Sequence, residues 1–276
     1  MPPIQVVIRD VDAKITTFTT PFNRFAPFGY RKFVAVGNRA TAVRLHDNRI
    51  LLLNPIPLDP SVHDKLNSLG GVHLIAADLG HHMYVQEYLH TWPSAKALGV
   101  PGLDNKRQDI KWSFIYNDWR APPEQHFDFA HDIETVLFQG FITYAVAWFH
   151  KPSQTLIQSD LMMNLPCTEQ YTPSSAHQGP GSRAFANRAH PRSVWAKRLV
   201  YHIATVDFTL MRRDAKRVAE WEIQRIIPCH GDVIERGGNE AWATLYEWYL
   251  ASNSREGLGK KLMTPVMKVA RWMFLM

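Results

Sequence analysis

The chain has 276 residues, a length that allows one large domain or two small ones and a sizeable core. Hydrophobic residues make up 46% and charged residues 20%, which is the composition of a globular protein and not of a disordered one. The formal net charge is +6, but the basic residues are spread along the chain and form no concentrated groove for nucleic acid. We therefore expect a small-molecule substrate and no nucleic-acid partner.

The cysteines and the apolar segments indicate in which cellular compartment the protein is expected. The two cysteines, Cys167 and Cys229, are too few and too far apart for a disulfide framework or a thiolate zinc cluster, and they are typical of reduced thiols. The first residues lack the apolar core of a signal peptide. No apolar run reaches the length of about 20 residues that spans a bilayer. We expect a cytoplasmic protein without an integral membrane segment.

The first third of the chain predicts strands that alternate with helices. Its apolar, β-branched runs are separated by turn residues and by two segments with helical spacing. In chain order we expect strands over 31–45 and 49–57, a helix over 59–69, a strand over 72–78 and a helix over 82–92.

The rest of the chain continues with strands and ends with helices. Short apolar runs predict strands over 111–117, 133–139, 142–150 and 154–160. We then expect two helices within 193–224, broken near 206–213, a strand over 225–232 and a helix over 239–253. Strands dominate the first two-thirds and helices flank them, so the fold class is α/β or α+β, a sandwich with helices on its outer faces.

Two segments stand apart from this pattern. Residues 164–192 are rich in Pro, Gly, Ser and Asn, and a loop this long is either functional or disordered. Because it follows a candidate site residue, we expect a lid over a substrate site. Residues 259–276 mix bulky apolar and basic side chains. This tail predicts docking on its own domain or on a second copy in a homodimer, with contact to a membrane surface as the alternative.

Polar side chains follow three of the predicted strands. His81 and His82 come after 72–78, Asp160 ends 154–160, and His230 lies near the end of the strand over 225–232. Strand ends are where α/β proteins assemble sites from separate loops. Each residue alone also suits a cap or a turn, but together they predict a site for zinc or a similar divalent metal.

The order of these residues resembles the metallo-β-lactamase superfamily. "PCHGD" (228–232) resembles the last metal-binding element of that family, and "LIQSDL" (156–161) resembles the strand that ends in its aspartate. The stretch 137–164 is similar to the two-strand hairpin between them, and its "HKPSQTL" (150–156) is similar to the pattern of one branch. The resemblance covers roughly residues 30–250 and implies an αββα sandwich, with residues 1–258 as one domain.

The motif that supplies most metal ligands in this family is incomplete. When "ADLGHH" (77–82) is laid on the family pattern His-x-His-x-Asp-His, Ala77 and Leu79 stand in place of the first two histidines. Phe141, after Gly140, stands in place of a third histidine further along. The resemblance therefore implies that one of the two metal positions is lost.

The other metal position keeps most of its ligands. His82 and His230 match histidines of the family, Asp160 matches the aspartate, and His81 stands where a second aspartate is usual. The resemblance implies one divalent ion held by these four residues, with zinc preferred and iron as the other candidate.

The function implied is that of an intracellular single-metal hydrolase-like enzyme or a related lyase. A metal-bound water would attack a small, partly apolar substrate, with Asp160 and His81 in catalytic roles and Asp78 as a further carboxylate nearby. The alternative is a metal-free member of the fold that acts as a binding protein or as a non-hydrolytic biosynthetic catalyst.

Overall fold

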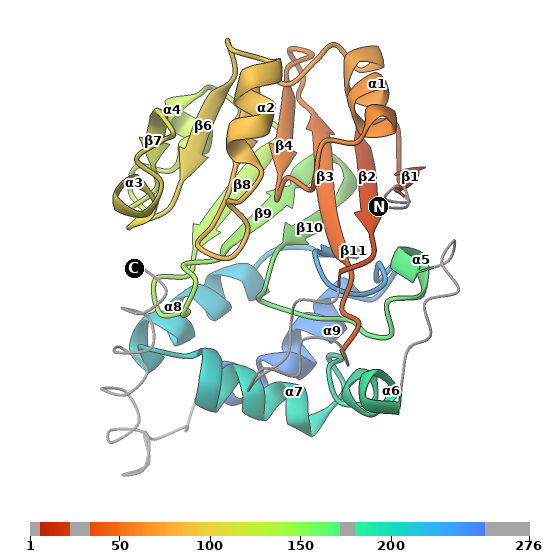
Figure 1. The fold of residues 1–276 in the computed structure, drawn as a ribbon. Coiled ribbons are helices and arrows are strands. Elements are labelled where there is room, and N and C mark those ends of the chain that lie inside the picture. Colours follow the sequence, from red (N-terminus) through yellow and green to blue (C-terminus); the bar gives the residue numbers. More distant parts are fainter. Residues whose placement is uncertain (1–5, 23–33, 172–179, 252–276) are drawn as a thin grey trace.

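Two β-sheets face each other and carry helices on their outer sides (Figure 1). A computed structural model describes residues 6–22, 34–171 and 180–251 of the chain. Part of the predicted loop over 164–192 and the whole tail over 259–276 lie outside these residues, as does the domain boundary at 258. Among the described residues, no helix is both long and apolar enough to cross a membrane.

The larger sheet has seven strands in chain order, antiparallel from β1 to β4 and parallel from β4 to β7. Its strands are β1 (Val7–Asp10), β2 (Ile15–Thr20), β3 (Asn38–Arg44), β4 (Ile50–Leu53), β5 (Leu74–Ala76), β6 (Lys96–Gly99) and β7 (Trp112–Ile115). Because β4 to β7 run parallel, the loops that follow them leave from the same edge of the sheet.

The smaller sheet has the order β11-β10-β9-β8. Its strands are β8 (Ile133–Leu137), β9 (Val146–His150), β10 (Thr155–Gln158) and β11 (Arg225–Pro228). Because β10 and β11 are parallel, the loops after them also emerge together. These loops carry Asp160 and His230.

Short helices complete the two outer layers. They are α1 (Pro60–Ser68), α2 (Val85–Thr91), α3 (Leu103–Lys106), α4 (Pro123–His126), α5 (Thr168–Tyr171), α6 (Pro180–Ala186), α7 (Val194–Arg198), α8 (Phe208–Ala219), α9 (Gly238–Leu245) and α10 (Glu247–Leu250). A 3₁₀ turn, η2 (Lys151–Ser153), follows β9, and a π-helix, η3 (Leu199–Ala204), continues α7. Helices α1 and α2 lie beside the larger sheet, and α7, α8 and α9 lie beyond the smaller one (Figure 1).

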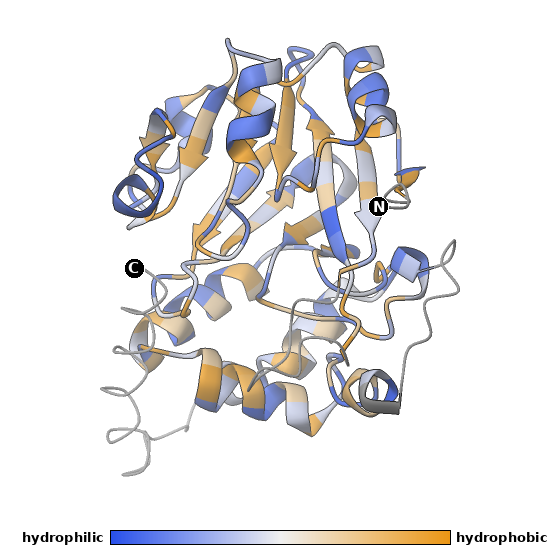
Figure 2. Cartoon of the chain, viewed as in Figure 1, coloured by the Kyte–Doolittle hydropathy of each residue, from blue (hydrophilic) through white to orange (hydrophobic). Residues whose placement is uncertain are grey.

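Two hydrophobic layers hold this arrangement together. One lies between the sheets and beneath α1 and α2, and it includes Leu52, Tyr88 and Trp148. The other packs the far face of the smaller sheet against η3, α8, α9 and α10, around residues such as Phe138 and Trp242. Figure 2 shows hydrophobic residues gathered in the strands and hydrophilic residues over much of α1 and α2. The αββα sandwich predicted from the sequence is confirmed.

Some elements differ from the sequence prediction. Strands β1, β2 and β6 were not predicted, although "ITTFTT" in β2 is a β-branched run that could have indicated one. The described parts of 164–192 contain α5 and α6 and bury Cys167 and Ala189 in a small third cluster with Val36. This segment is therefore only partly a loop, because its apolar residues have a surface to pack on.

A buried arginine ties the two sheets together. Arg39, in β3, is 1% exposed, and its Nη1 donates to the carbonyl oxygens of Pro228 and Gly231. Its Nη2 pairs with Glu169 Oε2 at 3.0 Å. Burial lowers the pKa of Arg39, and the charge of Glu169 opposes this effect. The guanidinium thus fixes the turn after β11 against the start of β3.

We expect Arg39→Met to lower the free energy of unfolding by about 3 kcal/mol, because it removes the partner of two carbonyl groups and the nearer of the two arginines that pair with Glu169. Urea unfolding followed by circular dichroism measures this change. The control Lys111→Ala, at an exposed lysine, should alter the free energy by no more than about 0.5 kcal/mol. Equal stability of Arg39→Met and the parent would contradict this role.

The turn "HKPSQ" between β9 and β10 is organised by His150. Its Nδ1 lies 2.7 Å from Ser153 Oγ, which in turn donates to Thr155 Oγ1 at 2.9 Å. The ring is 1% exposed. Burial lowers the pKa of His150, the carboxylates of Asp12 and Asp132 oppose this effect, and Lys14 adds to it. The folded state therefore favours the neutral ring.

This burial predicts a pH dependence of stability. The unfolded chain binds a proton at position 150 more readily than the folded one, so stability is full above the ordinary histidine pKa of about 6.5 and decreases as the pH falls below it. His150→Asn keeps an amide near Ser153 but cannot titrate. We expect urea unfolding of this variant to vary less between pH 7.5 and pH 5 than that of the parent. An unchanged pH profile would show that the ring contributes nothing to it.

Candidate metal centre

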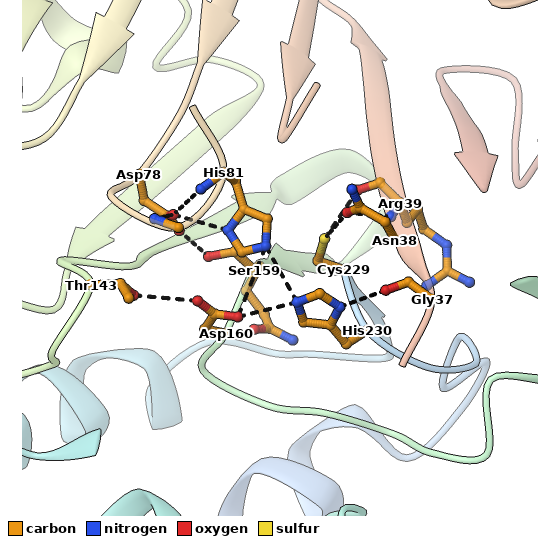
Figure 3. A network of polar contacts seen from close by, with 12 residues as sticks. Gly37, Asn38, Arg39, Asp78, His81, Thr143, Ser159, Asp160, Cys229 and His230 are labelled. Carbon is orange, nitrogen blue, oxygen red and sulfur yellow. Dashed lines mark hydrogen bonds and ion pairs between the residues drawn. The ribbon is translucent and has the colours of Figure 1, made fainter. Parts of the chain in front are cut away.

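Four loops bring polar side chains together at one end of the sandwich (Figure 3). His81 lies in the loop after β5, Thr143 between β8 and β9, Asp160 after β10 and His230 after β11. The parallel pairing of β10 with β11 places Asp160 and His230 side by side. His81 reaches them from the larger sheet.

Three ligand atoms converge at the centre of this group. His81 Nε2 lies 3.4 Å from His230 Nε2, and Asp160 Oδ1 lies 3.3 Å from His230 Nε2 and 3.9 Å from His81 Nε2. The side chains of His81 and His230 are only 9% and 6% exposed. The sequence prediction named these three residues, and the structure brings them together.

Each imidazole is oriented through its other nitrogen. His81 Nδ1 lies 2.9 Å from Asp78 Oδ1, and His230 Nδ1 lies 2.7 Å from the carbonyl oxygen of Gly37. Because a carboxylate and a carbonyl only accept hydrogen bonds, both Nδ1 atoms carry hydrogen and both Nε2 lone pairs turn inward. Two lone pairs and a carboxylate that face one another need a proton or a cation between them. This donor set, with its orienting partners, fits a divalent metal.

Asp78 organises the whole loop that carries His81. Its Oδ1 accepts from the backbone N–H groups of Gly80, at 2.8 Å, and His81, at 3.0 Å. Its Oδ2 accepts from the hydroxyl of Ser159, which precedes Asp160. A Cβ atom at position 80 would lie 3.1 Å from Asp160 Oδ2, so glycine lets the loop approach the carboxylate closely. Asp78 is thus a positioning residue for both sides of the site.

The loop before β3 positions His230 in a similar way. Gly37 adopts a φ of +66°, and a side chain there would collide with Gln170, whose Oε1 lies 2.0 Å from the Cβ position. Gln170 Nε2 donates to the carbonyl of Cys229 at 2.8 Å, and its Oε1 accepts from the N–H of Gly231 at 2.9 Å. Gln170, from α5, therefore holds the backbone on both sides of His230.

Sequence reasoning missed Cys229 as a member of the site. Its Sγ and one ring nitrogen each of His81 and His230 lie within 4.8 Å of one another. The thiol lies 2.9 Å from Asn38 Oδ1, to which it donates. Burial by itself raises the pKa of Cys229, but the two imidazoles outweigh it and the pKa is lowered. Cys229 was expected to be a reduced thiol, because two cysteines far apart in the sequence do not indicate a thiolate zinc cluster, and its place next to His230 is the signal that could have indicated it.

The charges of the site favour a positive centre. Burial opposes ionisation of Asp160, but His81 and His230 lower its pKa to about 2. Burial also opposes protonation of both imidazoles, yet Cys229 and the nearby carboxylates raise the pKa of each, that of His81 well above its ordinary value. The site thus stabilises added positive charge between its ring nitrogens.

His82 does not join the other three expected ligands. Arg107 Nη1 donates to the carbonyl oxygen of His82 at 2.8 Å and lies 3.2 Å from its Nδ1. Burial and the charge of Arg107 lower the pKa of His82 to about 4. Across the described part of the chain, no group of close ligand atoms includes His82. The two adjacent histidines point different ways, and the structure assigns the convergent position to His81.

Apolar side chains occupy the positions where the family pattern has three further histidines. Ala77, Leu79 and Phe141 are 7%, 2% and 3% exposed, and each belongs to a hydrophobic layer. Leu79 is held by a backbone hydrogen bond to Thr143, at 3.3 Å. None of these side chains carries a metal-binding atom, and the loss of one metal position stays a prediction from the resemblance.

A second group of metal-binding side chain types lies elsewhere. It consists of His46, His131 and Asp132, with His46 Nδ1 2.8 Å from Asp132 Oδ2. His46 is in the turn before β4, whereas the site loops leave from the opposite end of the parallel strands. His46 and His131 are exposed, so this group belongs to the surface.

The convergent residues form the floor of a cavity of about 460 Å³. His81, Thr143, Asp160 and His230 contribute polar atoms, as do Asn38 and Tyr84, while most of its wall is apolar. The apolar lining includes Phe22, Met83, Phe141, Met163, Leu199 and Ile203. A cavity with few polar groups gathered at one place is the usual form of a small-molecule site.

Comparison with known proteins gives matches in structure only. No protein-family model matches the sequence, and a search of curated proteins finds no match either. The metal-soaked Flv1 flavodiiron core from Synechocystis sp. PCC6803 is similar with a TM-score of 0.60 and 11% identity, over 98% of this chain and 69% of that one. The mono-zinc form of the metallo-β-lactamase FIM-1 from Pseudomonas aeruginosa gives 0.53 and 11%, over 98% of both chains.

A metallo-β-lactamase from Hirschia baltica is also similar, with a TM-score of 0.55 and 11% identity, over 88% of this chain and 97% of that one. Identities this low are informative about the fold alone. The matches extend over nearly all of this chain and include both sheets of the sandwich. The chain therefore has the fold of the metallo-β-lactamase superfamily, to which the motifs at 156–161 and 228–232 pointed.

Proposed function

We propose that this protein is a single-metal hydrolase that acts on a small, partly apolar substrate. The observation that carries the proposal is the pair of inward-facing Nε2 atoms of His81 and His230, 3.4 Å apart and beside the Asp160 carboxylate. Two similar structures, the mono-zinc FIM-1 and the metal-soaked flavodiiron core, were determined with metal. Zinc suits a set of imidazole and carboxylate ligands, with iron as the other candidate.

Some residues of the site would bind the metal ion, and others would orient the attacking water. His81, His230 and Asp160 would hold the ion, and Cys229 is a fourth donor of a type that zinc accepts. A bound divalent ion supplies Lewis acidity, which makes water a nucleophile near neutral pH. Asp160 lines the cavity and accepts from the Thr143 hydroxyl at 3.5 Å, so it is the carboxylate placed to orient an attacking water.

A second candidate function follows from the same geometry. A proton could replace a metal between the imidazoles and Asp160, because the distances also suit hydrogen bonds. The protein would then be a metal-free binding protein or a non-hydrolytic catalyst that uses the apolar cavity. The loss of ligands at Ala77, Leu79 and Phe141 favours this alternative, and metal content separates the two.

We expect the purified protein to bind one zinc or iron ion per chain, measured by elemental analysis after the metal is supplied and the excess removed. His81→Ala and His230→Ala should lose this ion, because each removes an inward-facing nitrogen. His82→Ala is the matched control and should keep it, since His82 lies beside Arg107.

Two results would contradict the proposal. Absence of bound metal in the parent, even after zinc and iron are supplied, would exclude a metallohydrolase. Loss of the ion in His82→Ala as complete as in His81→Ala would show that the ligand set is wrong. Thermal unfolding of all variants shows whether a loss arises from misfolding.

We expect Asp78→Asn to weaken metal binding about 10- to 100-fold, because it removes the carboxylate that orients His81 while keeping an oxygen for the backbone hydrogen bonds. Competition with a chelator measures the change in dissociation constant. Asp104→Asn, at an exposed position in α3, is the control. An affinity of Asp78→Asn equal to that of the parent would show that this contact does not support the site.

A further inference from the structure

A second cavity adjoins the one above the candidate metal centre. Its volume is about 280 Å³, and it shares Asp160, Met163, Leu199 and Ile203 with the first cavity. The rest of its apolar wall comes from α6, α7, η3 and α9 and from two loops, through Phe185, Trp195, Ala196, Val200, Leu245, Leu161 and Ala189. A molecule bound at the metal centre therefore has apolar space to extend into.

Polar groups are distributed unevenly along this double cavity. The first part has the histidines, Thr143 and Asp160 on its floor. Besides Asp160, the polar residues of the second part are Arg188, Arg198 and His202, and all three are exposed. Arg188 donates to the carbonyl of Ala184 at 2.7 Å, and the guanidinium of Arg198 lies over the Trp195 ring at 5.2 Å. Beyond Asp160, the interior of the cavity can therefore bury an apolar part of a ligand and contact it by dispersion. It has few groups that could bind a polar part.

The wall that joins the two cavities is the π-helix η3. Leu199 and Ile203, four residues apart, line both cavities. Its end is fixed to the site loop, because the N–H of Ile142 donates to the carbonyl of Ala204 at 2.8 Å, next to Thr143. Thr205 Oγ1 donates to the carbonyl of Val200 at 2.7 Å. π-helical turns are frequent at functional sites, and this one places apolar side chains beside the reacting groups.

We propose that the substrate is a carboxylic ester or thioester with a linear aliphatic acyl chain, whose carbonyl lies at His81, Asp160 and His230 and whose chain passes Met163 into the second cavity. The proposal rests on the hydrolase function proposed above. Water adds its oxygen to the acyl carbon, the bond from this carbon to the alcohol or thiol breaks, and the leaving group takes a proton from the water. The products are the fatty acid and the free alcohol or thiol.

Binding of the product acids tests the chain site without relying on catalysis. Calorimetry would measure the affinity for the straight-chain carboxylates from butanoate to dodecanoate, in chelator-treated and in zinc-loaded protein. Each added methylene that becomes buried should raise the affinity about fourfold until the second cavity is filled. The same slope is expected with and without metal. Affinities that do not depend on chain length would overturn the proposal.

Two variants in α7 show whether the acids bind in the second cavity or on the surface of the protein. Ala196→Phe fills the second cavity and should abolish the gain from longer chains while leaving butanoate binding unchanged. Val194→Phe is the matched control, because Val194 is 46% exposed and does not line the cavity. If Ala196→Phe leaves the gain intact, the acids adsorb elsewhere and the proposal fails. Thermal unfolding shows that both variants fold.

Hydrolysis of p-nitrophenyl esters over the same chain lengths then separates the two proposals. Turnover by the zinc-loaded protein that increases with chain length supports both. Chain-dependent binding without turnover supports the acyl-chain site and overturns the hydrolase. If neither the turnover nor the binding affinity depends on chain length, the acyl-chain site is overturned and the hydrolase is supported.

Discussion

The buried guanidinium of Arg39 is the interaction on which the arrangement of the site depends. It lies in the larger sheet and donates to carbonyl groups just before and just after His230, which belongs to the smaller sheet. A charge at this depth is tolerable because Glu169 and the carbonyls pair with the two terminal nitrogens of the guanidinium. The contact therefore fixes the turn that carries His230 against the larger sheet, whose loop after β5 carries His81.

The arrangement that results is a group of imidazole and carboxylate donors held in fixed positions. His81 and His230 are held in a single orientation by Asp78 and Gly37, so the ring nitrogens do not need to reorganise to bind a cation. Leu79 and Phe141, which belong to two of the loops at this end of the sandwich, are buried in the hydrophobic layers. Apolar side chains also line most of the two adjoining cavities.

Much of the fold could be predicted from the sequence, because runs of apolar residues between turn signals mark most strands. Strand β6 was not predicted because its four residues show too little periodicity. Strand β1 was not predicted because its partly exposed residues do not differ in hydropathy from a loop. Within the site, Cys229 was missed because two cysteines far apart in the sequence do not indicate a thiolate zinc cluster. Only the fold brings its Sγ close to the imidazoles of His81 and His230.

The sequence by itself determined that one set of histidines is missing, because Ala77, Leu79 and Phe141 cannot bind a metal in any conformation. It also placed Asp160 and His230 at strand ends, where the parallel pairing of β10 and β11 brings them together. Only the tertiary structure determined which of the two adjacent histidines, His81 or His82, faces Asp160 and His230. Their backbone lies in an irregular loop whose side-chain directions follow from Asp78 on one side and Arg107 on the other, and both contacts join residues that no local pattern relates.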